Sequence, residues 1–247
     1  MFDLSTIGWV IVVLCGLMIG FTKAGIPSLG ILVVTTLMFV FPAKDSVGIL
    51  LPMLIMGDLF AVIFYRRHVV WKYLLSLLPW VVIGLLCGYF VLDIVNDDQL
   101  KPIIGVIVLT MIGLHFWREK LGDRFNEMLP KSLWFTILMG ILGGFTTMVG
   151  NAAGGIMAIY LFVKGLPKSE FVGTGAWFFM FVNLFKVPFY IQLGLITTTS
   201  FTFNLMMFPA ILVGAFIGVK ILPYIPQKIF QILVLGFAAL GGLRLLF

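Results

Sequence analysis

The stretch Thr22-Lys23-Ala24-Gly25-Ile26-Pro27-Ser28, "TKAGIPS", interrupts an apolar run that extends from Ile7 to Phe41. Glycine allows turns and close backbone approach, and proline stops an incoming helix, so this stretch predicts a break between two short helices. A similar stretch, "TTMVGNAAGG", occupies residues 146–155 in the other half of the chain. The fold prediction starts from these two breaks and the apolar segments around them.

The composition is that of an integral membrane protein. Of the 247 residues, 62% are hydrophobic and 11% are charged, whereas about a quarter of the residues in soluble proteins are charged. Apolar stretches close to the ~20 residues that cross a bilayer recur along the whole length. The first stretch lacks the basic region and cleavage site of a signal peptide, so we take it as a membrane segment. We therefore expect a single transmembrane domain over residues 1–247.

Landmarks of the first half of the chain return in the second half in the same order. "GFT" at residues 20–22 returns at 144–146, and "GDLFAVIFY" at 57–65 aligns with "VNLFKVPFY" at 182–190. Such self-similarity is typical of transporters that are built from two copies of one unit. The other matches are Pro42-Ala43-Lys44 with Pro167-Lys168-Ser169, Val47-Gly48 with Val172-Gly173, and Pro79, Gly84 and Gly88 with Pro209, Gly214 and Gly218.

The predicted fold is an all-α polytopic membrane protein with two inverted-topology repeats of five apolar segments each. Repeat 1 covers about 6–117, a cytoplasmic linker covers 118–131, and repeat 2 covers about 132–247. The segments lie near 6–22, 27–41, 46–65, 72–92 and 101–117, and near 132–148, 154–164, 171–190, 199–219 and 228–246. The first two segments of each repeat are short for a hydrocarbon core of ~30 Å, which favours a re-entrant hairpin or a broken helix over two thin spans.

The basic residues predict the orientation. The loop from Arg66 to Lys72 and the linker from Arg118 to Lys131 are separated by one span out and one span back, so both can be cytoplasmic. The turn between them, "DIVNDDQLK", is acidic, as an outer loop can be. Both termini are then expected on the outer, periplasmic side of a bacterial inner membrane. The same parity places four further lysines inside: Lys164, Lys168, Lys220 and Lys228.

The breaks predict a binding site. Non-helical backbone at membrane depth is tolerated where it is buried in protein or lines a wet cavity. Each break also exposes the N-terminus of the following half-helix, whose free N–H groups favour an anion. The alternative is that the glycines only allow close helix packing. Packing alone does not require Lys23 or Asn151, so we favour the binding site.

Three charged residues, Lys23, Asp58 and Lys186, are predicted at membrane depth. Ionisable groups there cost a few kcal/mol or more and usually face a partner or a pathway. Asn183 aligns with Asp58 and shares a helix face with Lys186. Two cations and one carboxylate favour an anionic substrate, with Asp58 pairing with Lys186 or carrying a coupling proton. The alternatives are that Lys186 extends to the outer interface and that Asp58 hydrogen-bonds a neighbouring backbone.

Three stretches together resemble the TauE/SafE sulfite-exporter family of membrane transporters: "GFTKAGIPSLGILVV" at 20–34, "YRRH" at 65–68 and "FVGTGAWFFMFVNLFKVPFY" at 171–190. The resemblance covers both repeats and implies transport of sulfite, organosulfonates or related small anions. It also implies that Lys23, Gly25 and Ser28 lie at the family's Lys-Gly-Gly break, and that Asn183 and Lys186 form its Asn-x-x-Lys pair.

The sequence departs from the family at both breaks. The first has fewer glycines than the family pattern, and the second has Asn151 where a histidine is expected. An asparagine can still donate hydrogen bonds to an oxyanion. The predicted substrate-binding residues are Lys23, Gly25, Ser28, Thr147, Gly150, Asn151, Gly154, Gly155, Asn183 and Lys186, with Asp58 as the candidate for a coupling proton.

The predicted function is secondary transport, as an exporter, of a small anion such as sulfite, thiosulfate or an organosulfonate by alternating access, with protons as the candidate coupling ion. The alternatives are an anion channel and an importer of a carboxylate or another small anion. The chain has no Gly-x-Ser-x-Gly elbow and no His-Glu-x-x-His pair, so we expect no enzyme. No cofactor, metal or nucleic acid is expected. The expected partners are the small anionic substrate and the lipid bilayer. The sequence leaves open whether the protein forms a homo-oligomer.

Overall fold

The computed structural model describes residues 4–23, 30–122, 132–221 and 243. This part is helical and contains no strand. Apart from residue 243, the predicted segment 228–246 lies outside the described residues. Lys228, Gly25 and Ser28 also lie outside them. The elements are α1 (Thr6–Lys23), α2 (Gly30–Leu37), α3 (Ala43–Tyr65), η2 (Arg66–His68), α4 (Trp71–Ile94), α5 (Asp97–Leu121), α7 (Leu133–Gly150), α8 (Gly154–Val163), α9 (Lys168–Gln192) and α10 (Thr198–Ile221).

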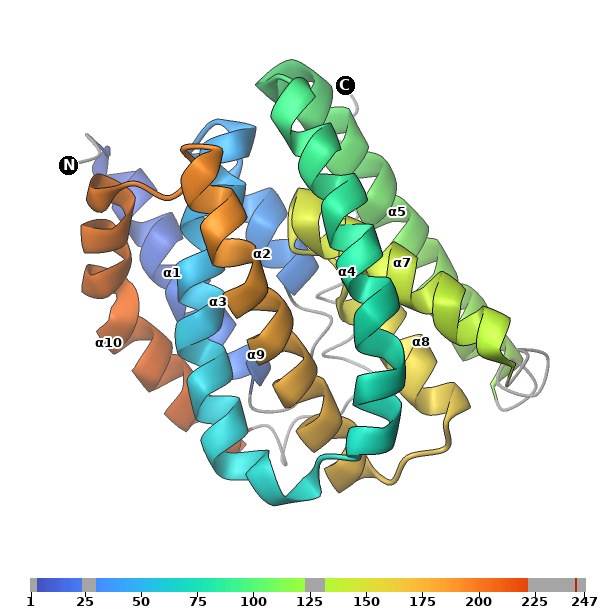
Figure 1. Cartoon of the computed structure of the whole chain (residues 1–247). Coiled ribbons are helices and arrows are strands. Elements are labelled where there is room, and N and C mark those ends of the chain that lie inside the picture. Colours follow the sequence, from blue (N-terminus) through green and yellow to red (C-terminus); the bar gives the residue numbers. More distant parts are fainter. Residues whose placement is uncertain (1–3, 24–29, 123–131, 222–242, 244–247) are drawn as a thin grey trace.

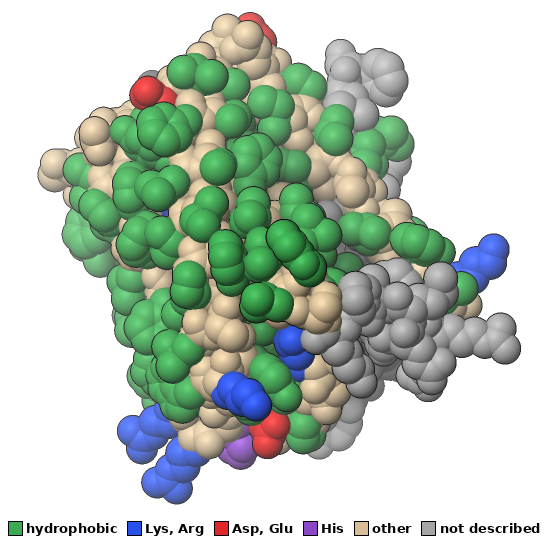
Figure 2. Space-filling model, turned by 45° about the vertical axis from the view of Figure 1, so that its right-hand side comes forward, with side chains coloured by type: hydrophobic (Ala, Val, Ile, Leu, Met, Phe, Trp, Pro, Cys, Tyr) green, Lys and Arg blue, Asp and Glu red, His purple; other side chains and the backbone are tan. Residues whose placement is uncertain are grey.

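The described helices confirm a polytopic membrane protein. Six of them, α1, α3, α4, α7, α9 and α10, are long and apolar enough to cross a membrane. Large apolar side chains face outward, with Ile63, Phe90 and Phe216 each more than 60% exposed. Figure 2 shows such side chains over the middle of one face, with most of the visible Lys and Arg side chains towards its lower end. This distribution suits a lipid environment.

Helices α2 and α8 are too short to cross a bilayer by themselves. They have 8 and 10 residues, or about 12 and 15 Å at ~1.5 Å per residue, against a core of ~30 Å. Each follows a longer helix and runs back along it. In Figure 1 the chain descends along α1 and returns upward along α2, whereas it rises along α7 and descends along α8.

The long helices pack in three main pairs, α1 with α10, α4 with α7, and α3 with α9. Helices α3 and α9 run side by side through the centre (Figure 1). The pair α1 and α10 lies on one side of them, and the pair α4 and α7 lies on the other. The centre of the molecule is therefore formed by the two helices that carry Asp58 and Lys186.

Glycines bring the outer helix pairs into close contact. A Cβ at Gly20 of α1 would overlap the backbone of α10, and a Cβ at Gly214 of α10 would overlap the backbone of α1. In the same way, Gly84 of α4 and Gly144 of α7 each meet the backbone of the partner helix. The sequence aligns Gly20 with Gly144 and Gly84 with Gly214, so aligned glycines make matching contacts in the two pairs.

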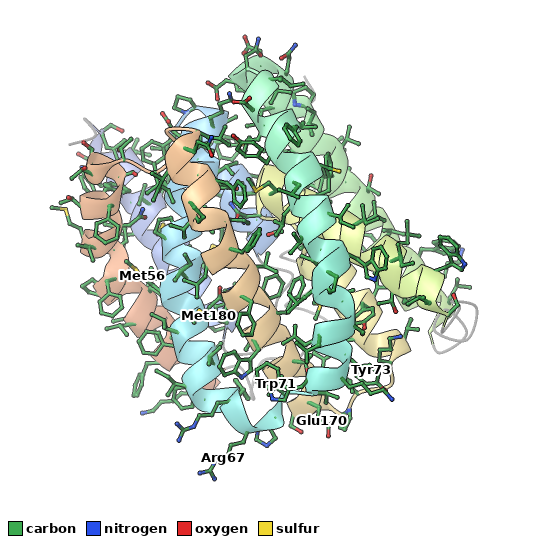
Figure 3. The ribbon with its side chains drawn as sticks, in the orientation of Figure 1. Met56, Arg67, Trp71, Tyr73, Glu170 and Met180 are labelled. Atoms are coloured by element: carbon green, nitrogen blue, oxygen red, sulfur yellow. The ribbon has the colours of Figure 1, made fainter. Side chains whose placement is uncertain are left out.

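The ends of the central helices α3 and α9 are held together by close packing and a hydrogen bond. Gly173, near the start of α9, packs against the backbone of His68, and the N–H of Val70 donates to Thr174 Oγ1 over 2.9 Å. At the opposite end, Gly48 of α3 packs against the backbone of Leu195, just after α9. Figure 3 shows that η2, which follows α3 and is marked by Arg67, lies near the start of α9, marked by Glu170.

Candidate functional site

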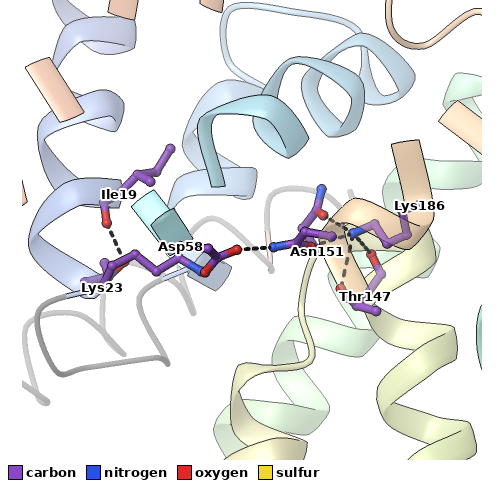
Figure 4. Close-up of polar contacts among 8 residues, drawn as sticks. Ile19, Lys23, Asp58, Thr147, Asn151 and Lys186 are labelled. Atoms are coloured by element: carbon purple, nitrogen blue, oxygen red, sulfur yellow. Dashed lines mark hydrogen bonds and ion pairs between the residues drawn. The ribbon is translucent and has the colours of Figure 1, made fainter. Parts of the chain in front are cut away.

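The described ends of the two breaks meet at the central helices. Helix α1 ends at Lys23, whose side chain reaches Asp58 of α3. Helix α7 ends next to Asn151, whose side chain reaches Lys186 of α9. Figure 4 shows these contacts in one view. The residues that the sequence predicts at membrane depth therefore lie together in the interior.

Asp58 is fully buried and both of its oxygens accept hydrogen bonds. Lys23 Nζ forms an ion pair with Oδ1, and Asn183 Nδ2 donates to Oδ2 over 2.7 Å. Asp58 therefore pairs with Lys23, and the predicted direct pair with Lys186 does not form. A carboxylate with a cation on one oxygen and an amide donor on the other has the surroundings of an ionised group.

Lys186 is also fully buried, but its partners are neutral. Its Nζ donates to the carbonyl and the hydroxyl of Thr147, over 2.9 and 3.2 Å, and to Asn183 Oδ1 over 3.3 Å. It also donates to Asn151 Oδ1. The side chain points into the protein, so it does not extend to the outer interface. Among the described residues, no carboxylate contacts it.

Asn151 ends α7 in the left-handed conformation, with φ of 54°. Its N–H donates to the Thr147 carbonyl over 3.0 Å, which closes the last turn. Asparagine adopts this conformation more easily than most residues. Its Nδ2 donates to the Val47 carbonyl of α3 over 3.2 Å, which turns Oδ1 towards Lys186. The second break is thus attached to both central helices.

The hydrogen bonds form a continuous polar chain across the interior: Lys23, Asp58, Asn183, Lys186, and then Thr147 and Asn151. The chain joins the end of α1 to the end of α7 through α3 and α9 (Figure 4). It holds two cations and one carboxylate. The residues missing from the described part of the first break, 24–29, include no charged residue in the sequence. Counted as formal charges, with both lysines protonated and Asp58 ionised, the site carries one surplus positive charge.

A cavity of about 50 Å³ adjoins this chain. Since a water needs about 10–15 Å³ of such space, it has room for a few waters or a small oxyanion. Its polar lining is Thr22, Lys23, Asp58, Thr147, Asn151 and Asn183, with Gly154 at the start of α8. The remaining wall is formed by Leu54, Ala61, Val172, Gly175, Ala176 and Phe179. Part of the lining can therefore donate hydrogen bonds, and the rest is apolar.

Phe179 joins the polar and the apolar part of the lining through a contact with Lys23. The Lys23 ammonium lies over its ring, 4.8 Å from the centroid, at a distance where a cation is attracted to an aromatic face. The Lys186 ammonium lies 5.3 Å from the ring centroid of Tyr190, whose hydroxyl donates to the Met148 carbonyl over 2.6 Å. Each lysine thus has one aromatic neighbour.

The structure places the predicted site residues in three groups. Five of them, Lys23, Thr147, Asn151, Gly154 and Asn183, line the cavity together with Asp58. Lys186 lies outside the cavity lining and contacts it through three of those residues. Gly150 instead faces Ile104 of α5, and Gly155 is outside the lining.

The sequence analysis missed the apolar residues of the lining. Ala61 lies one turn after Asp58, and Phe179 and Ala176 lie one and two turns before Asn183. Helical spacing from the two polar residues is the signal that could have found them. Among the described residues, no three His, Cys, Asp or Glu side chains come together in a way that could hold a metal ion.

Comparison with known proteins gives a family. A family model described as "Sulfite exporter TauE/SafE" matches residues 12–245, nearly the whole chain. The chain belongs to this family. The match confirms the resemblance seen in the sequence, and TauE/SafE membership indicates a membrane transporter that exports sulfite or a related anion. No curated protein and no solved structure matches the chain.

Proposed function

We propose that this TauE/SafE protein is a secondary transporter that exports a small anion, such as sulfite, thiosulfate or an organosulfonate, across the bacterial inner membrane by alternating access. The observation that carries the proposal is the cavity beside the polar chain of Lys23, Asp58, Asn183 and Lys186, with its one surplus positive charge. A buried cation without a counter-ion is costly, and an anionic ligand would offset that cost.

The cavity offers donors to an oxyanion. Lys23, Thr147 and Asn183 line it and each carries an N–H or O–H group. Gly154 begins α8, and the free N–H groups of a helix N-terminus favour negative charge. A glycine there also leaves space for a ligand to approach the backbone.

Two further features support alternating access. Matching glycine contacts in the pair α1–α10 and the pair α4–α7 support two repeats of one unit that can rock against each other. The short α2 and α8, which run back along α1 and α7, support re-entrant hairpins that enter from opposite faces.

The position of the cavity supports the direction of transport. Most of the lining that α3 and α9 contribute comes from the second half of α3 and the first half of α9, the halves that lie towards Arg66 and Arg67. By the positive-inside rule this is the cytoplasmic half. An exporter needs a site that takes its anion from the cytoplasm. The inside-negative potential then favours expulsion of a monoanion by about 2.3 kcal/mol per 100 mV.

Proton coupling is a separate prediction that concerns Asp58. A coupled cycle requires Asp58 to release Lys23 and take up a proton. The hydrogen bonds to both oxygens support an ionised carboxylate, so we expect the anion to bind while Asp58 is charged. Sulfite flux in vesicles with a pH gradient but no potential tests this: proton coupling predicts accumulation that Asp58→Asn abolishes.

Flux in reconstituted vesicles tests the transport proposal. We expect slow, saturable sulfite flux that Lys23→Gln removes. Lys101→Gln is the matched control, because Lys101 is a partly exposed lysine near the start of α5 that is paired with Asp98 and does not line the cavity. Rapid unitary currents would instead establish a channel, and saturable flux of carboxylates without sulfite flux would favour the importer.

A further inference from the structure

We propose that the Asp58–Asn183 pair sets the valence of the anion, so that among the candidate substrates the site accepts the monoanions hydrogensulfite and organosulfonates and rejects dianions such as thiosulfate. The inference rests on the proposed function, because it specifies the ligand of the same cavity. It assigns a specificity role to two residues that the sequence aligns with each other and that touch in the structure.

The two positions differ by one charge. Asp58 on α3 neutralises Lys23, whereas the aligned Asn183 on α9 contacts Lys186 with an amide oxygen. The first lysine therefore has a counter-ion and the second has only neutral acceptors. The asymmetry between a carboxylate and an amide at aligned positions creates the single surplus charge.

An amide can join the two halves in this way, and an ionised carboxylate cannot. Asn183 donates from Nδ2 to Asp58 and accepts at Oδ1 from Lys186, so it uses a donor and an acceptor at once. A second carboxylate at this position would lack the donor and would place two negative groups in contact. A second neutral residue at position 58 would leave both lysines without a counter-ion.

No other charge reaches the pair from the described helices around it. Lys23 from α1 and Lys186 from α9 are the charged groups that face it. Helix α10, which packs against α3, has Lys220 in its last turn and no other charged residue. Asp45 lies in the first turn of α3, far from Asp58 along the helix. Since Asp58, Asn183 and Lys186 are fully buried, one unit of ligand charge is poorly screened. A monoanion balances the site, and a dianion leaves a buried negative charge.

The test compares methanesulfonate with sulfate, which carry fixed charges of one and two near neutral pH and present similar oxygen groups. Binding of each is measured on the purified full chain by calorimetry. The unchanged protein should prefer methanesulfonate. Asp58→Asn leaves two uncompensated lysines, so the ratio of sulfate affinity to methanesulfonate affinity should rise at least about tenfold.

The matched control is the exchange Asp58→Asn with Asn183→Asp. It moves the carboxylate across the pair, keeps the amide–carboxylate hydrogen bond and restores the net charge, so the preference for methanesulfonate should return. An unchanged affinity ratio in Asp58→Asn, or an exchange that keeps the raised ratio, would overturn the inference. A preference for sulfate in the unchanged protein would overturn it even if Asp58→Asn did not fold. If the unchanged protein binds neither these anions nor sulfite, the proposed function itself fails.

Discussion

At the scale of single residues, the Lys23–Asp58 ion pair makes the most demanding prediction. Asp58 is fully buried, and the side chain of Lys23 is only 12% exposed. Lys23→Met should lower the free energy of unfolding by about 3–5 kcal/mol, because it leaves a buried carboxylate without its cation. Denaturant unfolding in mixed micelles measures this. Adding Asp58→Asn to Lys23→Met should recover part of the loss, and equal stability of Lys23→Met and the unchanged protein would show that the pair is not buried as described.

Asn151 combines a backbone role and a side-chain role, which two substitutions separate. Asn151→Gly and Asn151→Ala both remove the contact with Lys186, but only glycine keeps a φ of 54° without strain. We expect Asn151→Ala to be less stable than Asn151→Gly by about 1 kcal/mol. Thermal unfolding compares the two variants. If alanine is as stable as glycine, the second break does not require the left-handed conformation.

The sequence predicted which polar residues lie together better than it predicted which of them contact each other. Lys23, Thr147 and Asn151 follow from the chemistry of the breaks, because charged and polar groups at membrane depth are rare. The partner of Asp58 did not follow, since the distance between side chains on different helices is not written in the spacing along one helix. Phe179 was missed because an aromatic residue in an apolar helix usually packs against neighbouring helices and does not contact a ligand.

At the scale of helices, the glycine contacts predict where added volume is harmful. Gly20→Ala and Gly144→Ala would each push a Cβ into the backbone of a partner helix, and backbone cannot move aside as a side chain can. Both should lower the unfolding temperature. Gly113→Ala in α5 is the control, because no atom lies within 4 Å of its Cβ and alanine favours a helix by up to about 1 kcal/mol. Equal effects at all three positions would contradict the proposed close packing.

Most helices of the described part could be predicted from local signals. Glycine and proline indicated the breaks, and the length of the apolar runs indicated the long helices. Because a glycine-rich break precedes α8, the predicted segment 154–164 differs from α8 by only one residue. The predicted 27–41 runs past Leu37, where α2 ends, because apolar residues continue into a turn that periodicity does not detect. The pairing of α1 with α10 depends on contacts between distant parts of the chain.

At the scale of the whole molecule, the distribution of charge predicts the orientation. Arg67→Cys, in a variant that lacks Cys15 and Cys87, should react with a membrane-impermeant maleimide only from the cytoplasmic side. Asp98→Cys should react only from the periplasmic side. Asp98 is 92% exposed in the first turn of α5, and the length of α4 separates it along the chain from Arg67. Labelling of intact cells and of inverted vesicles makes the comparison. The reverse pattern would invert the topology and, with it, the inward position of the cavity.

The central claim is that the cavity between the two breaks binds a small anion through Lys23. Calorimetric titration of the purified protein with sulfite tests it most directly, with Lys23→Gln and the control Lys101→Gln measured alongside. We predict one sulfite per chain for the unchanged protein and for Lys101→Gln, and binding at least about tenfold weaker for Lys23→Gln, because the site loses its surplus charge. Undiminished sulfite binding by folded Lys23→Gln would contradict the account.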